Sequence, residues 1–285
     1  MVDLDKLEKD SRRLRRLQKF SNEARDRIIN DPLNDRALLS RSSSSSLDDL
    51  RNSAKLRSKL LEHLKVVWTQ YSPVKDSQVE HGLRKLREVI IGIYGQHNQD
   101  EEFMLFTFDV YKLSYEYYHA KKEHHKLGNL VLAFMVSNVP KRLAAEYAEA
   151  YAIFISHIER DMGNCLKFVN KWHSEGKLDD SYRRYVRMSM ILNNRTESAG
   201  KWFELLKEIP NSSLVYKLLR SSSAFLEMRD RCFATVSRCY NQISMSFLLH
   251  YWFHDFLDEA ELKTRLKTKV NDHGTEIVEF ERTRR

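Results

Sequence analysis

The chain has 285 residues, of which 42% are hydrophobic and 31% are charged, and its formal net charge is +8 at pH 7. It holds only 8 glycines and 4 prolines. Because tight sheet turns and phosphate-binding loops consume glycine, this composition disfavours both and favours long helices joined by short links. The basic excess permits binding to nucleic acid or another acidic partner without requiring it.

Residues 1–52 differ in composition from the rest of the chain. Leucines at helical spacing lie beside a cluster of arginines, which predicts either a short amphipathic helix or a partly helical, solvated arm. These residues are Leu4, Leu7, Leu14, Leu17, Arg12, Arg13, Arg15 and Arg16. The serine run 42–46 cannot bury apolar surface and therefore predicts a flexible linker. We expect residues 1–52 to form a basic, flexible N-terminal arm.

From residue 53 to residue 210 apolar residues recur every three or four positions, which is the periodicity of amphipathic helices. Successive segments begin near Leu56, Leu83, Phe103, Leu127, Leu143, Leu166, Tyr182 and Trp202. The last segment ends at Pro210, which cannot continue a helix. Consecutive helices with short links are typical of stacked helical hairpins, although no strict sequence period is present. The sequence predicts a mainly α protein with a degenerate, TPR-like helical-hairpin solenoid.

After Pro210 the pattern changes. One helix is predicted from Phe225 to Tyr240, and a second follows Ser244 as its N-cap. A third begins at the capping box of Asp258 and Glu261 and is expected to continue to Val270. Residues 275–282 then alternate between apolar and polar, as in a β-strand, and form the only strand that the sequence predicts. Three helices and a strand are the skeleton of a winged helix, which we expect over residues 211–285.

Candidate catalytic and metal-binding residues are few. His250 and His254 share a helix face, but no glutamate lies between them, so aromatic helix packing explains the pair better than a zinc site. Cys232 and Cys239 lie on an otherwise apolar helix, where buried structural thiols are expected. The sequence has no GxSxG, phosphate-loop or dinucleotide-binding motif. We expect no enzyme activity, no cofactor and no metal.

The compartment is indicated by cysteine usage and by the absence of targeting segments. The odd number of cysteines, without a CxxC pair, indicates reduced thiols. The N-terminus is charged from Asp3 onward, unlike a secretory signal, and no apolar run is long enough to span a bilayer. We therefore expect a nuclear or cytoplasmic protein that does not associate with a membrane.

Basic residues flank the predicted third helix, which is the element that enters a DNA groove in DNA-binding winged helices. They are Lys263, Arg265, Lys267 and Lys269. Residues two apart on a helix point to different faces, so these four do not form one stripe. Together with Arg282 they are candidate nucleic-acid-binding residues, and a solvated surface is the alternative.

The stretch from Phe225 to Tyr240, followed by the segment from Ile243 to Leu248, resembles the entry to the winged helix of the PCI family. Scaffold subunits of this family occur in the proteasome lid, the signalosome and an initiation-factor complex. Upstream, Phe108-Asp-Val-Tyr-Lys-Leu113 and Glu146-Tyr-Ala-Glu-Ala-Tyr151 resemble helix starts in the GANP branch, which acts in mRNA export. The His-rich stretch 121–126 departs from that branch. The resemblance covers about residues 80–282.

The resemblance implies a non-catalytic scaffold subunit. Such a subunit would pair with other PCI-type subunits or a small acidic Dss-type peptide, and GANP-type members also offer a basic surface to RNA. We therefore expect a subunit of a nuclear complex in mRNA processing or export. The alternatives are a scaffold subunit of the signalosome or the proteasome lid, and a stand-alone winged-helix nucleic-acid binder.

Overall fold

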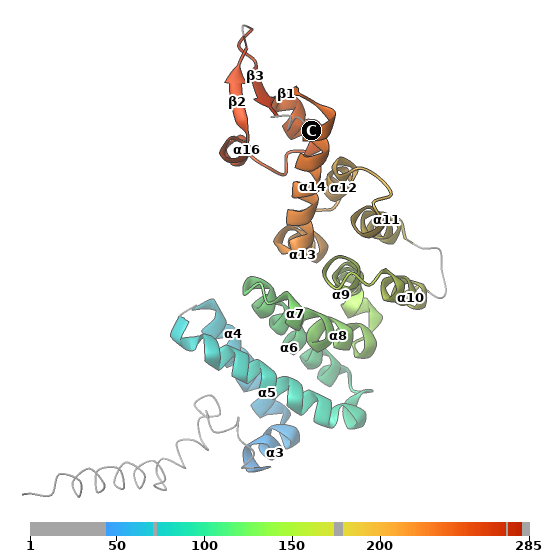
Figure 1. Ribbon diagram of the computed structural model, residues 1–285. Coiled ribbons are helices and arrows are strands. Elements are labelled where there is room, and N and C mark those ends of the chain that lie inside the picture. The colour runs from blue at the N-terminus through green and yellow to red at the C-terminus, as the bar shows by residue number, and fades with distance from the viewer. Residues whose placement is uncertain (1–43, 71–72, 174–178, 272, 281–285) are drawn as a thin grey trace, which may run out of the picture. The chain divides into compact units, whose positions relative to one another are not determined.

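The computed structural model describes residues 44–70, 73–173, 179–271 and 273–280 (Figure 1). The described part is mainly helical, as predicted. The chain forms two compact units, and the division between them falls between Ser114 and Tyr115. The predicted domain boundary between residues 210 and 211 lies inside the second unit. The predicted amphipathic helix of the N-terminal arm lies outside the described residues.

The first unit contains the first helices of the described chain. They are α3 (Ser44–Asn52), α4 (Ala54–Thr69), α5 (Pro73–His97) and the first part of α6 (Glu101–Ala120). The α4 helix begins where the Ser53 side chain accepts a hydrogen bond from the backbone N–H of Leu56, at 3.3 Å. The α5 helix packs against both α3 and α4. Leu64, Leu83 and Ile90 are fully buried in this core.

The α3 helix corrects the predicted N-terminal arm. It begins at Ser44, so the end of the serine run is helical and not a linker. Leu50 is 3% exposed. The buried guanidinium of Arg57 donates hydrogen bonds of 2.9 Å to the carbonyl oxygens of Leu50 and Arg51. These bonds satisfy carbonyls that the end of α3 would otherwise leave unpaired, so tertiary contacts stabilise a helix whose sequence favours a linker.

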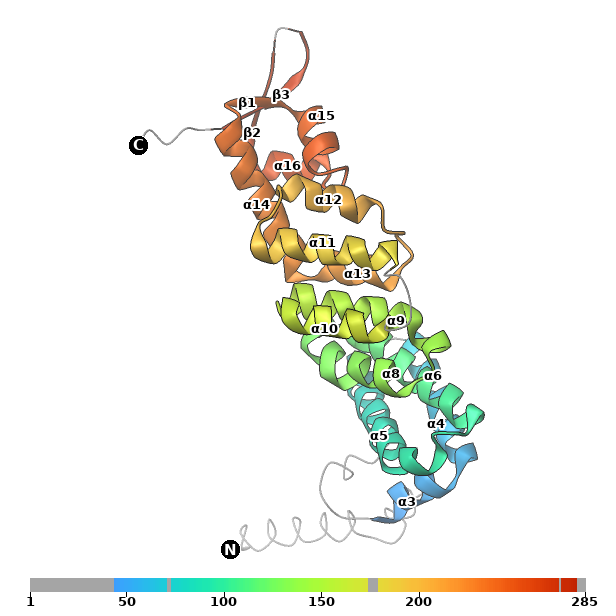
Figure 2. The same cartoon turned by 90° about the vertical axis from the view of Figure 1, so that its right-hand side faces the viewer.

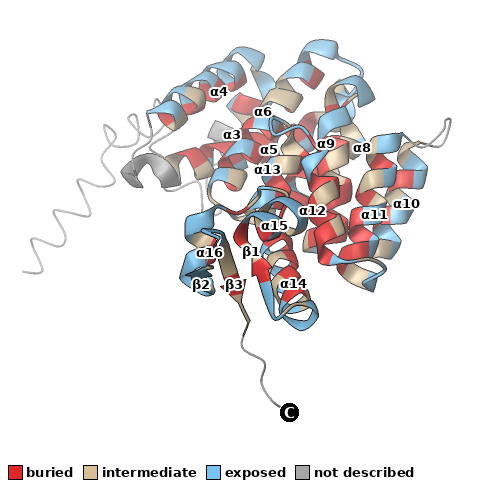
Figure 3. Cartoon of the chain, turned by 90° about the horizontal axis from the view of Figure 1, so that it is seen from above, coloured by how far each residue is buried: buried red, intermediate tan, exposed pale blue. Residues whose placement is uncertain are grey.

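The second unit continues with the end of α6 and with consecutive short helices. They are α7 (His124–Leu127), η2 (Gly128–Leu132), α8 (Ala133–Asn138), α9 (Lys141–Ile153), η3 (Phe154–Ile158), α10 (Met162–Trp172), α11 (Asp180–Asn194), α12 (Ala199–Lys207) and α13 (Leu214–Ser221). The η segments are π-helical turns. From α8 to α12 each α-helix packs against the next one along the chain, and Figure 2 shows them side by side. Their outer faces are exposed and their inner faces are buried (Figure 3).

The α13 helix was not predicted. Its N-cap is Ser213, whose side chain accepts a hydrogen bond of 3.1 Å from the N–H of Tyr216. The helix packs mainly against α9 and α14, so the stacking departs here from chain order. Val215, Leu218 and Leu219 form its buried face. The spacing of these apolar residues is itself helical, but Pro210 separates them from the preceding helical pattern, so the sequence did not predict the helix.

The last part of the second unit combines helices with a small sheet. It consists of α14 (Ser223–Cys239), β1 (Gln242–Ser244), α15 (Met245–Phe247), η4 (Leu248–Trp252), α16 (Glu259–Arg265), β2 (Lys267–Val270) and β3 (Glu276–Glu279). The strands are antiparallel in the order β1-β3-β2. Val278 pairs with Ile243 on one side and with Thr268 on the other, and its side chain is fully buried.

The predicted caps in this region are confirmed, but the predicted third helix is too long. The Ser244 and Asp258 side chains accept hydrogen bonds from the N–H groups of Phe247 and Glu261, respectively. The α16 helix ends at Arg265, and after Leu266 the next four residues form strand β2. The prediction of a single strand is therefore wrong. Thr268 and Val270 are β-branched, and the tight turn beginning at residue 271 allows β2 to pair with β3.

Candidate nucleic-acid interface

The structure separates the predicted basic residues between two elements. Lys263 and Arg265 lie on α16, whereas Lys267 and Lys269 lie on β2. Arg282 lies outside the described residues. The predicted third helix does not extend over the two lysines on β2, because the chain leaves the helical conformation at Leu266.

Most of these side chains lie against carboxylates. The Lys263 ammonium nitrogen is 2.5 Å from an oxygen of Glu259 and 3.0 Å from one of Glu276. Lys269 pairs with Glu279 across the sheet. These pairs are exposed and stabilise the fold little. To bind nucleic acid, however, each lysine would have to exchange its carboxylate partner for a phosphate.

Arg265 is also paired, and the local charge balance is neutral. Its guanidinium nitrogen is 3.3 Å from an oxygen of Asp230, and the group lies 5.9 Å from the ring centre of Phe233. Residues 223–285 contain ten lysines and arginines and ten aspartates and glutamates. The C-terminal part therefore does not carry the basic excess that electrostatic binding of nucleic acid requires.

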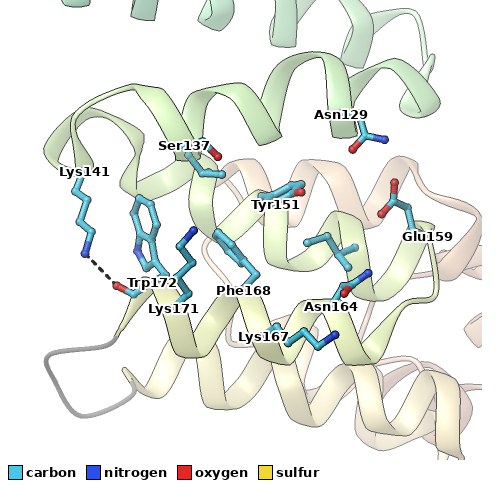
Figure 4. A pocket seen from close by; sticks show the side chains of 12 residues that line it. Asn129, Ser137, Lys141, Tyr151, Glu159, Asn164, Lys167, Phe168, Lys171 and Trp172 are labelled. Atoms are coloured by element: carbon cyan, nitrogen blue, oxygen red, sulfur yellow. Dashed lines mark hydrogen bonds between the residues drawn. The ribbon is translucent and has the colours of Figure 1, made fainter. Parts of the chain in front are cut away.

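The excess lies in the preceding helices. Residues 115–222 contain 17 lysines and arginines against 12 aspartates and glutamates, which is five of the eight net positive charges of the chain. Within this segment three consecutive helical regions enclose a groove of about 630 Å³ (Figure 4). We call it the α8–α10 groove. Its lining residues are Asn129, Val136, Ser137, Lys141, Tyr151, Ile155, Glu159, Asn164, Lys167, Phe168, Lys171 and Trp172.

Aromatic side chains form one wall of the α8–α10 groove. The rings of Tyr151 and Phe168 meet edge to face with their centres 4.9 Å apart. The ring of Trp172, one helical turn beyond Phe168, has its centre 5.9 Å from that of Phe168. All three residues are half-buried, so each leaves part of its ring accessible.

Three lysines accompany these rings. The Lys141 ammonium group donates a hydrogen bond of 3.3 Å to the carbonyl oxygen of Trp172 and lies 5.5 Å from the centre of the Trp172 ring. Lys167 and Lys171 are exposed and four residues apart, so they lie on one side of α10. No carboxylate of the described residues lies within ion-pair distance of either. Their charges are therefore available to a ligand.

The opposite end of the groove is acidic. Glu159 and Asn129 lie away from Lys141 in Figure 4. Burial and the nearby charge of Asp161 raise the pKa of the Glu159 carboxyl above its usual range. The charge of the groove therefore changes along its length. Lysines lie at one end and along α10, and a carboxylate lies at the other end.

Two π-helical turns position this end of the groove. A Cβ atom on Gly128 in η2 would lie 2.1 Å from a ring carbon of Phe154 in η3. Glycine therefore permits η2 and η3 to approach each other closely. Asn129 lies within η2 and Glu159 directly follows η3, so the positions of both residues depend on this contact. Sequence reasoning missed the site because its aromatic residues lie at helical spacing and no linear motif marks them.

His157 lies in a buried polar cluster. Its side chain is fully buried, and its Nδ1 is 2.9 Å from the hydroxyl of Ser156 and 3.4 Å from that of Ser189. The indole N–H of Trp202 donates to Nε2 at 3.4 Å. Burial lowers the pKa of His157 to about 3, so the imidazole is neutral. This cluster joins η3, α11 and α12.

The histidine pair that resembled a metal site is not assembled as one. His250 Nδ1 is 2.5 Å from a carboxylate oxygen of Asp255, and this contact lowers the pKa of that carboxyl. Burial lowers the pKa of the His254 imidazole. Within the part of the chain that the structure describes, no three His, Cys, Asp or Glu side chains gather around a common point.

The cysteines differ in environment. Cys165 and Cys232 are buried, and burial raises the pKa of the Cys232 thiol to about 12, so it is protonated at neutral pH. Cys239 is exposed at the end of α14, which corrects the expectation of a buried thiol there.

Comparisons with known proteins give no relative. No protein-family model, no curated protein and no solved structure matches this chain. Among the described residues, no helix has both the length and the apolar character needed to cross a lipid bilayer.

Proposed function

We propose that the chain is a non-catalytic scaffold subunit of a nuclear complex in mRNA processing or export. The observation that carries this proposal is the order of elements after α13. Helix α14, strand β1, the α15–η4 helix, helix α16 and the hairpin of β2 and β3 follow one another as in a winged helix. This unit follows stacked helices directly, which supports a PCI-like solenoid and winged helix.

An exposed aromatic surface supports pairing with another protein. Phe247 and Tyr251 are 38% and 67% exposed, and their rings stack with centres 4.6 Å apart. Beside them Tyr240 and Trp252 line a groove of about 320 Å³. Aromatic residues are enriched at the centres of protein interfaces. This surface is a suitable place for another PCI-type subunit or a small acidic Dss-type peptide.

The charge distribution separates this proposal from the stand-alone nucleic-acid binder. Lys263, Arg265 and Lys269 are all paired with carboxylates, and residues 223–285 have no net charge. A winged helix that acts alone on nucleic acid needs a net basic surface. Pairing with a protein therefore suits these residues better.

Affinity purification of the tagged full chain from cell extract tests the proposal. Export or mRNA-processing factors in the eluate would support it, whereas signalosome or proteasome-lid subunits would favour those complexes. Replacing both Phe247 and Tyr251 with serine should abolish partner recovery. The control Ile91→Ser removes an apolar side chain that is 60% exposed on α5 and should not affect recovery. Recovery of the unmodified chain alone, as a monomer, would count against any scaffold role.

A further inference from the structure

We propose that the α8–α10 groove binds single-stranded nucleic acid. Proteins that bind single strands combine a positively charged groove, which follows the backbone, with aromatic side chains on which bases stack. The α8–α10 groove has both features. Lys141, Lys167 and Lys171 lie beside a row of rings from Tyr151 to Trp172.

The lysines determine where the phosphates lie. Lys167 and Lys171 extend from one side of α10 with no carboxylate of the described residues to neutralise them, so they attract an anionic backbone. Glu159 at the other end repels phosphate. The strand backbone therefore follows α10 on the lysine side, and the bases turn toward the aromatic wall.

The rings determine how the bases bind. Phe168 lies between Tyr151 and Trp172, within 6 Å of both ring centres. Stacking on such rings is tolerant of base identity, because every base has a π-face. The volume of about 630 Å³ lies within the range of small-ligand pockets and suits a nucleobase with its sugar. Asn129 offers its amide group to base edges, whereas the amide nitrogen of Asn164 already donates a hydrogen bond of 2.6 Å to Asp161.

An acidic protein segment is the main rival occupant, and composition argues against it. Protein interfaces are depleted in lysine and enriched in arginine relative to the rest of the surface. The basic side chains of this groove are all lysines. The proposal does not depend on the scaffold role, because the residues that line the groove all precede the elements after α13 and its ligand is tested without any partner.

The test is a fluorescence-anisotropy titration of purified full chain with a labelled oligo(U) of about eight nucleotides. The double variant Lys167→Glu/Lys171→Glu should weaken binding about tenfold or more and should flatten the slope of log K against log salt by about 1.4. The matched control is Lys55→Glu/Lys59→Glu. It reverses two exposed lysines, also four residues apart on one helix, and changes the net charge equally. It should retain wild-type affinity and slope.

A second variant separates stacking from charge. Phe168→Leu keeps an apolar side chain but removes the central ring, so affinity should fall roughly fivefold while the salt slope stays unchanged. Circular dichroism verifies that each variant is folded. Absence of oligo(U) binding, or equal losses in the groove and control variants, would overturn the proposal. So would groove-dependent binding of a labelled Glu- and Phe-containing peptide without any binding of the oligonucleotide.

Discussion

The buried histidine makes the stability of the second unit dependent on pH. His157 is fully buried, and its pKa in the folded chain is lowered to about 3. In the unfolded chain an imidazole has a pKa of about 6.5. The unfolded state therefore binds a proton first as the pH falls. The stabilisation from the neutral imidazole is complete above the unfolded pKa and is lost progressively as the pH falls from there toward the folded pKa.

The size of this effect follows from the two pKa values. Each pH unit between them changes the free energy of unfolding by about 1.4 kcal/mol per proton. Integrated from pH 7 to pH 5, the His157 contribution to the free energy of unfolding falls by roughly 2 kcal/mol. The variant His157→Gln cannot be protonated, so this part of the pH dependence should disappear, although its stability at pH 7 should be lower because a buried polar contact is lost.

The assay is urea unfolding of wild type and variant at pH 7 and pH 5, followed by tryptophan fluorescence. Trp172, Trp202 and Trp252 all belong to the second unit, so the signal reports mainly on the part that contains His157. Other titrating groups are common to both chains and cancel in the difference. His125→Gln, which removes an exposed imidazole, is the control. Equal pH dependence in wild type and His157→Gln would refute the reasoning.

Two further predictions concern packing. Gly128→Ala places a Cβ against the Phe154 ring and should destabilise the second unit by about 1–3 kcal/mol in urea unfolding. In the control Gly95→Ala the added Cβ meets nothing within 4 Å, so this variant should stabilise α5 by about 0.5–1 kcal/mol. Stabilisation by both glycine substitutions would contradict the close contact between Gly128 and Phe154. Arg57→Met removes the buried donor at the end of α3 and should lower the free energy of unfolding by about 1.5–3 kcal/mol. The exposed control Lys55→Met on the same helix should have no effect, and equal values for the two would contradict the buried hydrogen bonds.

The sequence predicts the helices well because apolar periodicity is local. The segments around Leu83, Phe103 and Tyr182 are helices, and the caps at Ser244 and Asp258 have the predicted geometry. These signals need only the residues of one helix. Short strands have no comparable signal. Strand β1 has three residues, and β2 follows α16 after a single residue, so only pairing with β3 reveals them.

The candidate sites depend on contacts that are distant in sequence. Glu259 lies four residues before Lys263 on the same helix and is a local partner, whereas Glu276 reaches Lys263 only through the fold. The α8–α10 groove is assembled from three helical regions, none of which has a nucleic-acid motif. One local signal was present. Lys167 and Lys171 are each followed by an aromatic residue, Phe168 and Trp172, so a charged stripe runs beside an aromatic stripe along α10.

The lysines on β2 have a consequence for solubility. Strand β2 lies at an edge of the described three-stranded sheet, where unpaired backbone groups could recruit a strand from another copy of the chain. Val270, 67% exposed, would favour such growth. Lys267 and Lys269 are exposed on the same short strand and place charge beside its open backbone. Lysine on an edge strand disfavours pairing of that edge with another chain.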